Sequence, residues 1–524
     1  MMWKNGLRAT LLALTLTGLA PAAASAQTPT PVPPSQTAPQ VRTLTLDDAV
    51  RLALENNLGI RVAQIDPRIQ DLGIAAAHGA WVPTFTSTLQ AAATDSPSNS
   101  FLSGAQGSTI SDNRVNSNVG VTQALPWGGR YSIGWDATRS TTTNLFSNFS
   151  PQLRSSLALN YQQPLLRGFR IDSARQQLLV SEKNREIADV TLRQTIAATT
   201  RSVRVAYFDL AYATGSLLVN RQSLELAQQS LRDTRARVEI GTTPPIDIVE
   251  AEAEVARNEE AVIVAEAAIE RAQDALRALI YNPDMADFWT VRLETAALPP
   301  FQPMAIDVDA VVRSALGRRT DLQQARKNLE AADIDIRFFR NETLPDVTAS
   351  IDYGLTGLGG TQFLRGEGFP GPVVGQAQRS FGTVLGDLFG RDFPNWTASL
   401  SISYPIGATQ SESNLARARL QYSQSTTQLK NQELQVVTEV RQTVRDVQTN
   451  QKRVETTRAA RALAERRLEA EQRKLAAGTS TSFVVFQAQR DLTEALNNEL
   501  RATLDFARSV IDLETVQEAP LTAR

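Results

Sequence analysis

The 524-residue sequence predicts a mixed α+β fold made of two internal repeats. Coiled-coil spacing is the first reason for this prediction, because apolar residues after a turn at 241–247 recur every seven positions. They are Ile248, Val255, Val262, Ile269 and Leu276. The second reason is a comparable turn at 478–484, which again separates two helical stretches. The third reason is a change to a period of two within 84–163 and 345–405, which is typical of strands with one apolar face.

The N-terminus has the features of a secretory signal peptide. Basic residues precede a short apolar run at 11–20, and the small residues Ala24 to Ala26 provide a cleavage site. A membrane anchor is the alternative, but the run is shorter than the about 20 residues that a spanning helix needs. We therefore predict a signal peptide over 1–26, an exported mature protein, and a disordered Pro-rich leader over 27–42.

The composition argues against several classes of function. The 53 basic residues nearly balance the 55 acidic ones, so the sequence does not predict a nucleic-acid partner. Cysteine is absent, which excludes disulfides and thiolate metal sites. His78 is the only histidine, and a solvated residue at a helix end is the simplest interpretation of it. We find no nucleophile–base constellation, and we predict neither an enzyme, nor a cofactor, nor a metal site.

The two repeats share one order of elements: helices, strands, a long helix, a tip turn and a return helix. A single offset aligns Leu54 with Leu316 and Pro83 with Pro345. Each of these prolines marks the change from helix to strand. The predicted segments are repeat 1 over 43–282, a linker over 283–305, repeat 2 over 306–513 and a C-terminal tail over 514–524.

Six strands are predicted, each apolar on one face and small or polar on the other. They are Thr84–Ala91, Val115–Leu125, Tyr131–Arg139, Leu153–Gln163, Val347–Thr356 and Trp396–Tyr404. The segments 93–113, 140–150 and 357–392 are predicted to be loops. This pattern suits a lipid-facing wall around a wet lumen and equally a one-sided soluble sheet. Six strands are fewer than the about eight of the smallest common barrels, so a barrel would require several copies of the chain.

Four motifs carry a resemblance to a known family. They are the segment Leu46 to Asn57, the run Arg319 to Leu322, the pair Leu344-Pro345 and the two Gly-Thr tip turns. In this order and duplicated, they resemble the TolC family of outer-membrane efflux proteins over essentially the whole mature chain. The resemblance implies a homotrimer, with a twelve-stranded β-barrel in the outer membrane that continues into a periplasmic tunnel of coiled-coil α-helices.

The resemblance also implies a function and partners. The protein would be the passive exit duct of a tripartite efflux or type I secretion system, gated at its periplasmic helix tips. It would dock to a periplasmic adaptor and an inner-membrane transporter of the RND or ABC class. A periplasmic coiled-coil adaptor is the alternative, although such proteins normally carry one hairpin rather than two. Extraction that requires detergent, together with a stable trimer, would distinguish the duct from the adaptor.

One departure from the family concerns the first repeat. The family has two strands in each half, whereas this repeat has four, with Pro126 to Gly129 as the turn of an additional hairpin at 115–139. The extra pair either extends beyond the membrane or enlarges the barrel. We favour the extension, because the helical tunnel would then still match twelve strands.

Candidate site residues follow from the resemblance. The residues expected to dock the adaptor are Gly241, Thr242, Thr243, Gly478, Thr479 and Ser480. Asp247 aligns with a family acidic residue that lines the constriction, where three copies would form a cation-selective ring. Its alternative role is to stabilise the helix dipole. Candidates for aromatic girdles at the membrane interfaces are Trp127, Tyr131, Trp135, Trp396 and Tyr404, with packing in a soluble sheet as the alternative.

Overall fold

The structure is a computed structural model that describes residues 41–98, 103–105, 107–284, 288, 290–296, 301–407 and 409–518. The predicted signal peptide and most of the predicted leader lie outside the described residues. Residues 41 and 42, which the sequence places in the leader, instead begin strand β1 (Val41–Leu44). This strand pairs in parallel with β6 (Arg292–Thr295) of the predicted linker.

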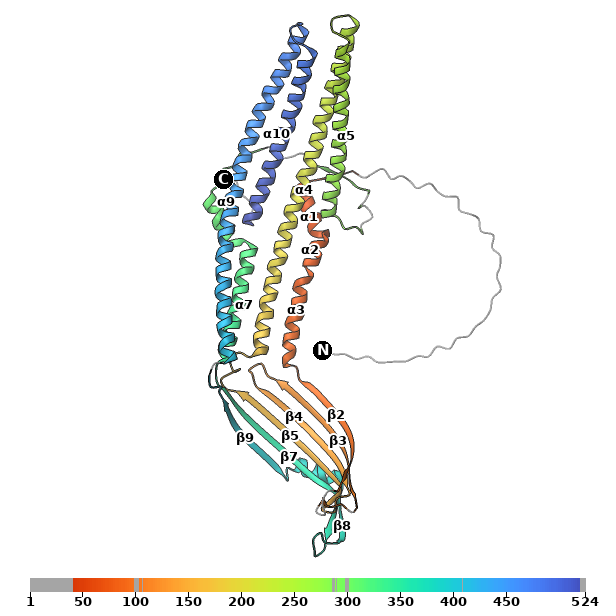
Figure 1. The fold of residues 1–524 in the computed structure, drawn as a ribbon, viewed down its shortest axis with the longest axis vertical. Coiled ribbons are helices and arrows are strands. Elements are labelled where there is room, and N and C mark those ends of the chain that lie inside the picture. Colours follow the sequence, from red (N-terminus) through yellow and green to blue (C-terminus); the bar gives the residue numbers. More distant parts are fainter. Residues whose placement is uncertain are drawn as a thin grey trace, which may run out of the picture. The chain divides into compact units, whose positions relative to one another are not determined.

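Helices account for most of the described chain (Figure 1). The first repeat contains α1 (Leu46–Asn56), α2 (Leu58–Ala63), α3 (Ile65–His78), the short 3₁₀ helix η1 (Gly79–Trp81), α4 (Ser173–Glu239) and α5 (Ile246–Ile280). The second contains α6 (Val308–Arg318), α7 (Thr320–Glu342), α8 (Phe381–Gly390), α9 (Gln410–Ala476) and α10 (Ser482–Gln517). Among the described residues, none of these helices combines the length and apolar composition needed to cross a bilayer.

Two long helical hairpins dominate the helical part, α4 with α5 and α9 with α10. The helices α4 and α9 each have 67 residues, which corresponds to about 100 Å at about 1.5 Å per residue. Both begin at a side-chain cap. Asp172 accepts a hydrogen bond from the Arg175 backbone N–H, and Thr409 forms a reciprocal capping box with Glu412.

Each repeat has an apolar core where its short N-terminal helix meets its long helix. In the first, α1 packs on α4 and buries Ala49 and Ala53 beside Val203. In the second, α6 packs on α9 and buries Ala315 beside Val440. The buried valines of α9 follow a coiled-coil spacing: Val436, Val440, Val444, Val447 and Val454. The duplicated sequence therefore forms duplicated packing.

The strands form one antiparallel sheet with the order β2-β3-β4-β5-β7, and β8 and β9 share the far side of β7. The bounds are β2 (Thr84–Pro97), β3 (Thr109–Ala124), β4 (Arg130–Thr142), β5 (Phe149–Pro164), β7 (Asp346–Arg365), β8 (Val373–Arg379) and β9 (Pro394–Ser403). Strand β9 pairs with 346–355 of β7, and β8 pairs with 360–365. The sheet is therefore six strands wide along its length.

The structure corrects two predictions about the strands. The segment 357–392, predicted as a loop, contains the second half of β7, strand β8 and helix α8. The additional hairpin is not an extension beyond the sheet, because β3 and β4 pair along their length with β2 and β5. Its turn lies at the helical end of the sheet, where Gln123 donates a hydrogen bond to the Trp81 carbonyl at 2.7 Å.

Candidate functional site

The two hairpin tips have the same backbone geometry. Gly241 and Gly478 adopt positive φ angles of 76° and 75°, a conformation that glycine adopts without strain. The Thr242 N–H donates to the Arg237 carbonyl at 2.9 Å, and the Thr479 N–H donates to the Lys474 carbonyl, also at 2.9 Å. These bonds satisfy the last carbonyls of α4 and α9 in a Schellman motif. The tips are thus two copies of one turn.

The second tip also has a charged support. Ser480 donates a hydrogen bond to the Glu471 carboxylate at 2.9 Å, and Lys474 forms an ion pair with the same carboxylate at 2.8 Å. The Lys474 and Ser480 hydrogen bonds lower the pKa of Glu471. The turn is therefore fixed to the preceding helix through side chains as well as through the backbone.

A ladder of polar contacts joins the two hairpins along α4 and α10. Its α4 members, Ser216, Ser223 and Ser230, are seven residues apart. They contact α10 in three hydrogen bonds: Ser216 with Asn497 at 3.4 Å, Ser223 with Thr493 at 2.8 Å and Ser230 with Gln489 at 2.9 Å. One heptad earlier, Asp209 forms an ion pair with Arg508. We call these contacts the polar seam.

The interior of the second hairpin is different. Leu468 of α9 packs with Val485 and Ala488 of α10 in a buried apolar cluster. Apolar contacts resist separation because exposing them to water costs free energy, whereas hydroxyl and amide groups exchange their partners for water at little net cost. The seam is thus the weaker of the two kinds of helix contact near the tips.

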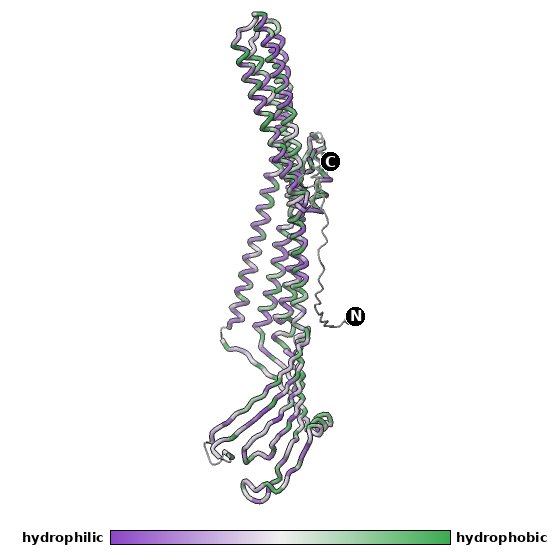
Figure 2. The backbone as a smooth tube through the Cα atoms, turned by 90° about the vertical axis from the view of Figure 1, so that its right-hand side faces the viewer, coloured by the Kyte–Doolittle hydropathy of each residue, from purple (hydrophilic) through white to green (hydrophobic). Residues whose placement is uncertain are grey.

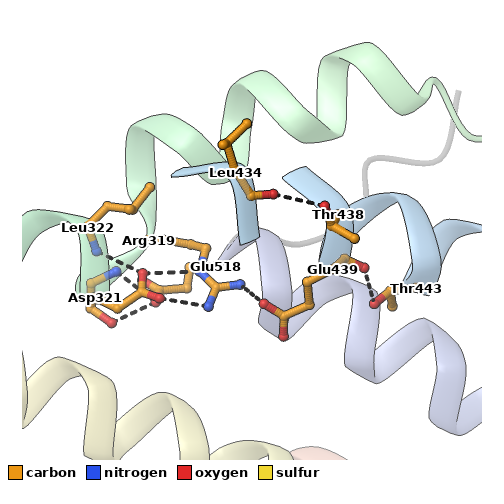
Figure 3. Close-up of polar contacts among 9 residues, drawn as sticks. Arg319, Asp321, Leu322, Leu434, Thr438, Glu439, Thr443 and Glu518 are labelled. Atoms are coloured by element: carbon orange, nitrogen blue, oxygen red, sulfur yellow. Dashed lines mark hydrogen bonds and ion pairs between the residues drawn. The ribbon is translucent and has the colours of Figure 1, made fainter. Parts of the chain in front are cut away.

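An ionic junction fixes the start of α7 against the middle of α9 and the end of α10 (Figure 3). The Arg319 guanidinium contacts Asp321 at 2.8 Å and Glu439 at 2.5 Å. Glu518 accepts hydrogen bonds from the Thr320 N–H at 2.9 Å and its hydroxyl at 2.7 Å. Burial lowers the pKa of Arg319, but its hydrogen bonds with the two carboxylates outweigh burial, so the pKa is raised. The Arg-Thr-Asp motif therefore has a structural role.

Apolar and polar residues alternate along the strands of the sheet (Figure 2). Strand pairing keeps the two kinds in register across all six strands, so the sheet has one apolar and one polar face. One row of paired residues on the apolar face is Phe85, Val121, Ile133, Leu159, Tyr353 and Trp396. The adjacent row on the polar face is Thr84, Thr122, Ser132, Asn160, Asp352 and Thr397. The sheet thus has one side suited to lipid and one suited to water.

Comparison with known proteins gives the family of the chain. The sequence profile of the family described as "Outer membrane efflux protein" matches residues 49–280 and 311–516. The chain belongs to the outer membrane efflux protein family. The resemblance carried by the duplicated motifs is therefore confirmed. No curated protein sequence matches the chain.

Solved structures share the fold of this efflux protein. The CmeC outer membrane channel of Campylobacter jejuni is 15% identical, with a TM-score of 0.62, and the alignment covers 90% of this chain and 85% of that one. VceC of Vibrio cholerae is 18% identical, with a TM-score of 0.60 and coverage of 91% and 97%. A membrane protein of Pseudomonas aeruginosa is 16% identical, with a TM-score of 0.64 and coverage of 91% and 90%. The fold is that of TolC-like outer-membrane channels, as predicted.

The structure places the predicted gate residue in the first turn of α5. Asp247 is half-buried, and its backbone N–H donates to the Pro244 carbonyl at 3.1 Å. Within the described part of the chain, its carboxylate forms no ion pair or side-chain hydrogen bond. The equivalent position in the second hairpin holds Val484. The two tips of the efflux protein thus share a backbone but differ in charge.

The predicted docking residues are spread over both tips. Gly241, Thr242, Gly478 and Thr479 are exposed, whereas Thr243 and Ser480 are half-buried. The hydroxyls of Thr242 and Thr479 donate to the same carbonyls as their backbone N–H groups, those of Arg237 and Lys474. Both tips of the efflux protein therefore present an exposed glycine followed by a threonine whose hydroxyl is bonded to the end of the preceding helix.

The aromatic candidates lie at two levels of the sheet. Trp127 and Tyr404 are exposed at the helical end. Tyr131, Trp135 and Trp396 lie on the apolar face, within three neighbouring rows. The indole N–H of Trp135 donates to the Ser155 hydroxyl at 2.8 Å, and Trp396 is 75% exposed in the single chain.

Among the residues that the structure describes, no group of three or more His, Cys, Asp or Glu side chains is arranged to hold a metal ion. His78 is exposed at the end of α3, with its ring 5.7 Å from that of Trp81. The family consists of channels, and the geometry offers surfaces and faces rather than a reaction centre.

Two features escaped the sequence analysis. The polar seam has a visible signal, since Asp209, Ser216, Ser223 and Ser230 recur every seven residues along α4. The second feature is a pair of ion pairs between α4 and α7, Lys183 with Glu330 and Lys327 with Glu186. They have no such signal, because each lysine also belongs to an ordinary Lys-x-x-Glu pair of the kind that many solvated helices carry.

Proposed function

We propose that this efflux protein is the outer-membrane exit duct of a tripartite efflux or type I secretion system. In this proposal it assembles as a homotrimer with a membrane barrel and a periplasmic helical tunnel. The duct is passive, and an inner-membrane transporter of the RND or ABC class supplies the energy. A periplasmic adaptor links the two at the helix tips.

The exposed edges of the sheet carry this proposal. The edge strands β2 and β9 are exposed at every residue in the single chain. Unpaired backbone groups at a sheet edge are costly inside a bilayer, where water cannot satisfy them. Strand β2 leads away from the helical end and β9 leads back to it, so β2 of one copy continues the antiparallel order beside β9 of the next. When identical copies close the sheet into a barrel in this way, no edge strand is left unpaired.

The apolar face supports the same assembly. Phe85 and Leu89 of β2 are 66% and 79% exposed, and Leu400 and Ile402 of β9 are 60% and 69% exposed. Such side chains gain free energy when lipid replaces water around them. The polar face then lines the duct, where hydroxyl and amide side chains keep a wet lumen.

The experiment is to express the full-length protein with its signal, separate the membranes by density and extract the outer membrane with detergent. Native mass spectrometry should give three chains for each particle, and extraction should fail without detergent. A monomer that is soluble in buffer would contradict the proposal and favour the adaptor.

Docking at the tips is tested separately. Photo-crosslinking residues placed at Thr242 and Ser480 should capture a periplasmic adaptor in cells, whereas the same probe at exposed Arg445 of α9 should not. Equal capture at all three positions would argue against a docking role for the tips.

A further inference from the structure

We propose that the barrel of the assembled efflux protein has eighteen strands, six from each of three copies. This inference rests on the proposed trimer and extends it. The family resemblance alone implies twelve strands, four from each copy. The difference is the hairpin formed by β3 and β4, which we place in the membrane wall as an ordinary part of the barrel.

Strand pairing is the first argument. Strand β3 pairs with β2 without a register shift from Thr84↔Thr122 to Pro97↔Thr109. Strand β4 pairs with β5 from Arg130↔Gln162 to Ser140↔Gln152, also without a shift. Strands β2 and β5 therefore do not touch each other; the hairpin separates them along its whole length. Removing the hairpin from the wall would require both ladders to break.

The faces of the hairpin are the second argument. Val119, Val121 and Ile133 lie on the apolar face in the same rows as Leu157, Leu159 and Tyr353. Asn118, Ser132 and Asp136 lie on the polar face. A hairpin in water outside the membrane would gain nothing from a lipid-compatible face that matches its neighbours row by row.

The position of the hairpin turn is the third argument. A Cβ atom on Gly128, whose φ is +91°, would lie 2.8 Å from the Gly168 carbonyl oxygen, just before α4. The turn therefore lies against the junction of sheet and helices, where a chain extending to the outside of the cell would not reach. The opposite ends of β3 and β4 are the ones that face away from the helices.

Helix and strand order show where the two strands are inserted. The helices nearest the sheet lie in the order α3, α4, α7, α9, and they connect to β2, β5, β7 and β9 respectively. The hairpin adds two strands between β2 and β5 without adding a helix. Three copies would thus place eighteen strands on a ring of twelve helices.

The dimensions of the two rings favour this count. Twelve helices packed about 8–10 Å apart have a perimeter of about 100–120 Å. Strands about 4.8 Å apart and tilted by about 40° each occupy about 6 Å of perimeter, so twelve give about 75 Å and eighteen about 110 Å. The eighteen-stranded ring matches the helical ring without a narrow neck. Because barrel diameter grows roughly with strand number, the outlet is about one and a half times as wide as a twelve-stranded one.

The test uses four single-cysteine variants in a chain that has no native cysteine. Ile133→Cys and Ser132→Cys probe the hairpin. Trp396→Cys and Thr397→Cys lie in the same two rows on β9 and serve as matched controls. Each trimer is labelled with a nitroxide in lipid bilayers, and its accessibility to oxygen and to a water-soluble nickel complex is measured.

We expect oxygen to dominate at positions 133 and 396, and the nickel complex to dominate at 132 and 397, with ratios that differ several-fold between the faces. Nickel dominance at both 132 and 133, with normal controls on β9, would overturn the eighteen-stranded wall and leave the duct intact. Nickel dominance at all four positions would instead contradict the membrane barrel itself.

A second measurement counts the strands directly. Electron cryomicroscopy of the detergent-extracted trimer should show eighteen strands in cross-section, and twelve would overturn the inference. In a companion variant, residues 98–148 are replaced by Asn-Gly, a two-residue hairpin turn. Because β2 and β5 are antiparallel, this turn joins them directly with their faces preserved. We expect that variant to show twelve strands and a visibly narrower barrel; an unchanged barrel width would count against the proposal.

Discussion

Lys183 of α4 and Glu330 of α7 form an ion pair at 2.9 Å, and beside it Lys327 of α7 pairs with Glu186 of α4 at 2.8 Å. Each helix also holds its own Lys–Glu pair, at 2.9 Å on α4 and 3.1 Å on α7. Every charge of this quartet thus has two opposite neighbours. The network joins a helix of the first repeat to one of the second.

We expect the pairs of the quartet to be energetically coupled. Lys183→Met and Glu330→Gln should each lower the melting temperature of the detergent-solubilised protein. The double variant should lose less than the sum, with a coupling of about 0.5–1 kcal/mol. The value is modest because Glu330 is 46% exposed. The control is the surface pair Arg473 and Glu469, within one helix and more exposed, where coupling should be smaller. If the stability losses of the two single variants simply add up in the double variant, the quartet does not stabilise the protein through coupling.

The quartet also predicts a pH window for stability. Hydrogen bonds with Lys327 and Lys183 lower the pKa of Glu186, and those with Lys183 and Lys327 lower the pKa of Glu330. Their contribution is present above the ordinary glutamate pKa of about 4.3 and is lost as the pH falls through the lowered values. Hydrogen bonds to Glu330 and Glu186 raise the pKa values of both lysines. Their contribution is present below about 10.4 and is lost as the pH rises through the raised values.

The melting temperature of the native protein should therefore fall at both ends of the pH range. In the variant Lys183→Met/Lys327→Met both decreases should be smaller. At low pH the carboxylates have lost the cations that lower their pKa values, and at high pH the two titrating lysines are absent. The measurement is thermal unfolding followed by intrinsic fluorescence between pH 3 and pH 11. Identical profiles for the two proteins would show that other groups set the pH dependence.

Arg319 should matter more than its exposed neighbour Arg318. Its side chain is only 16% exposed and holds both Asp321 and Glu439, so Arg319→Ala leaves two carboxylates without their shared cation. We expect a loss of about 1–2 kcal/mol, seen as a lower melting temperature. Arg319→Lys should recover only part of it, since an ammonium cannot reproduce the planar fork of a guanidinium. Arg318→Ala is the matched control, and an equal effect there would contradict the junction.

The polar seam leads to a prediction about gating. If the tips open by separation of the hairpins, a covalent link across the seam should hold them closed. Ser223→Cys/Thr493→Cys replaces two hydroxyls that are 2.8 Å apart, and the chain has no other cysteine. Oxidation should lower channel conductance, and a reductant should restore it. The reduced double variant and Ser223→Cys alone are the controls. Full conductance after complete oxidation would show that the gate opens without movement at this seam.

Much of the fold could be predicted from sequence because its signals are periodic. The seven-residue spacing and the Gly-Thr turns determine the hairpins, and strict alternation determines the six strands of the wall. Strand ends were less visible: β2 continues through Ala91 to Pro97 although its later residues no longer alternate, because pairing with β3 maintains it. Helix α8 was missed although Phe381, Val384 and Leu388 follow helical spacing, since its three glycines favour a loop.

The site was less predictable, for a physical reason. Tip residues and Asp247 follow from local motifs, but contacts between elements depend on register. Whether the 115–139 hairpin extends or widens the sheet depends on the pairing of β3 with β2 and of β4 with β5, which no single-strand pattern contains. The partner of Lys183 is likewise 147 residues away, and only the packing of α7 on α4 selects it.

The charge difference between the tips leads to a last prediction. Asp247 supplies a carboxylate at the start of α5, whereas Val484 occupies the same place in α10. In a closed trimer three Asp247 carboxylates would face a common axis and attract cations. Asp247→Asn keeps the shape and removes the charge, so cation-over-anion selectivity in planar-bilayer recordings should fall. Val484→Asp adds a second ring at the equivalent position and should raise it. If neither substitution changes the reversal potential in a salt gradient, the constriction lies elsewhere and Asp247 serves only its own helix.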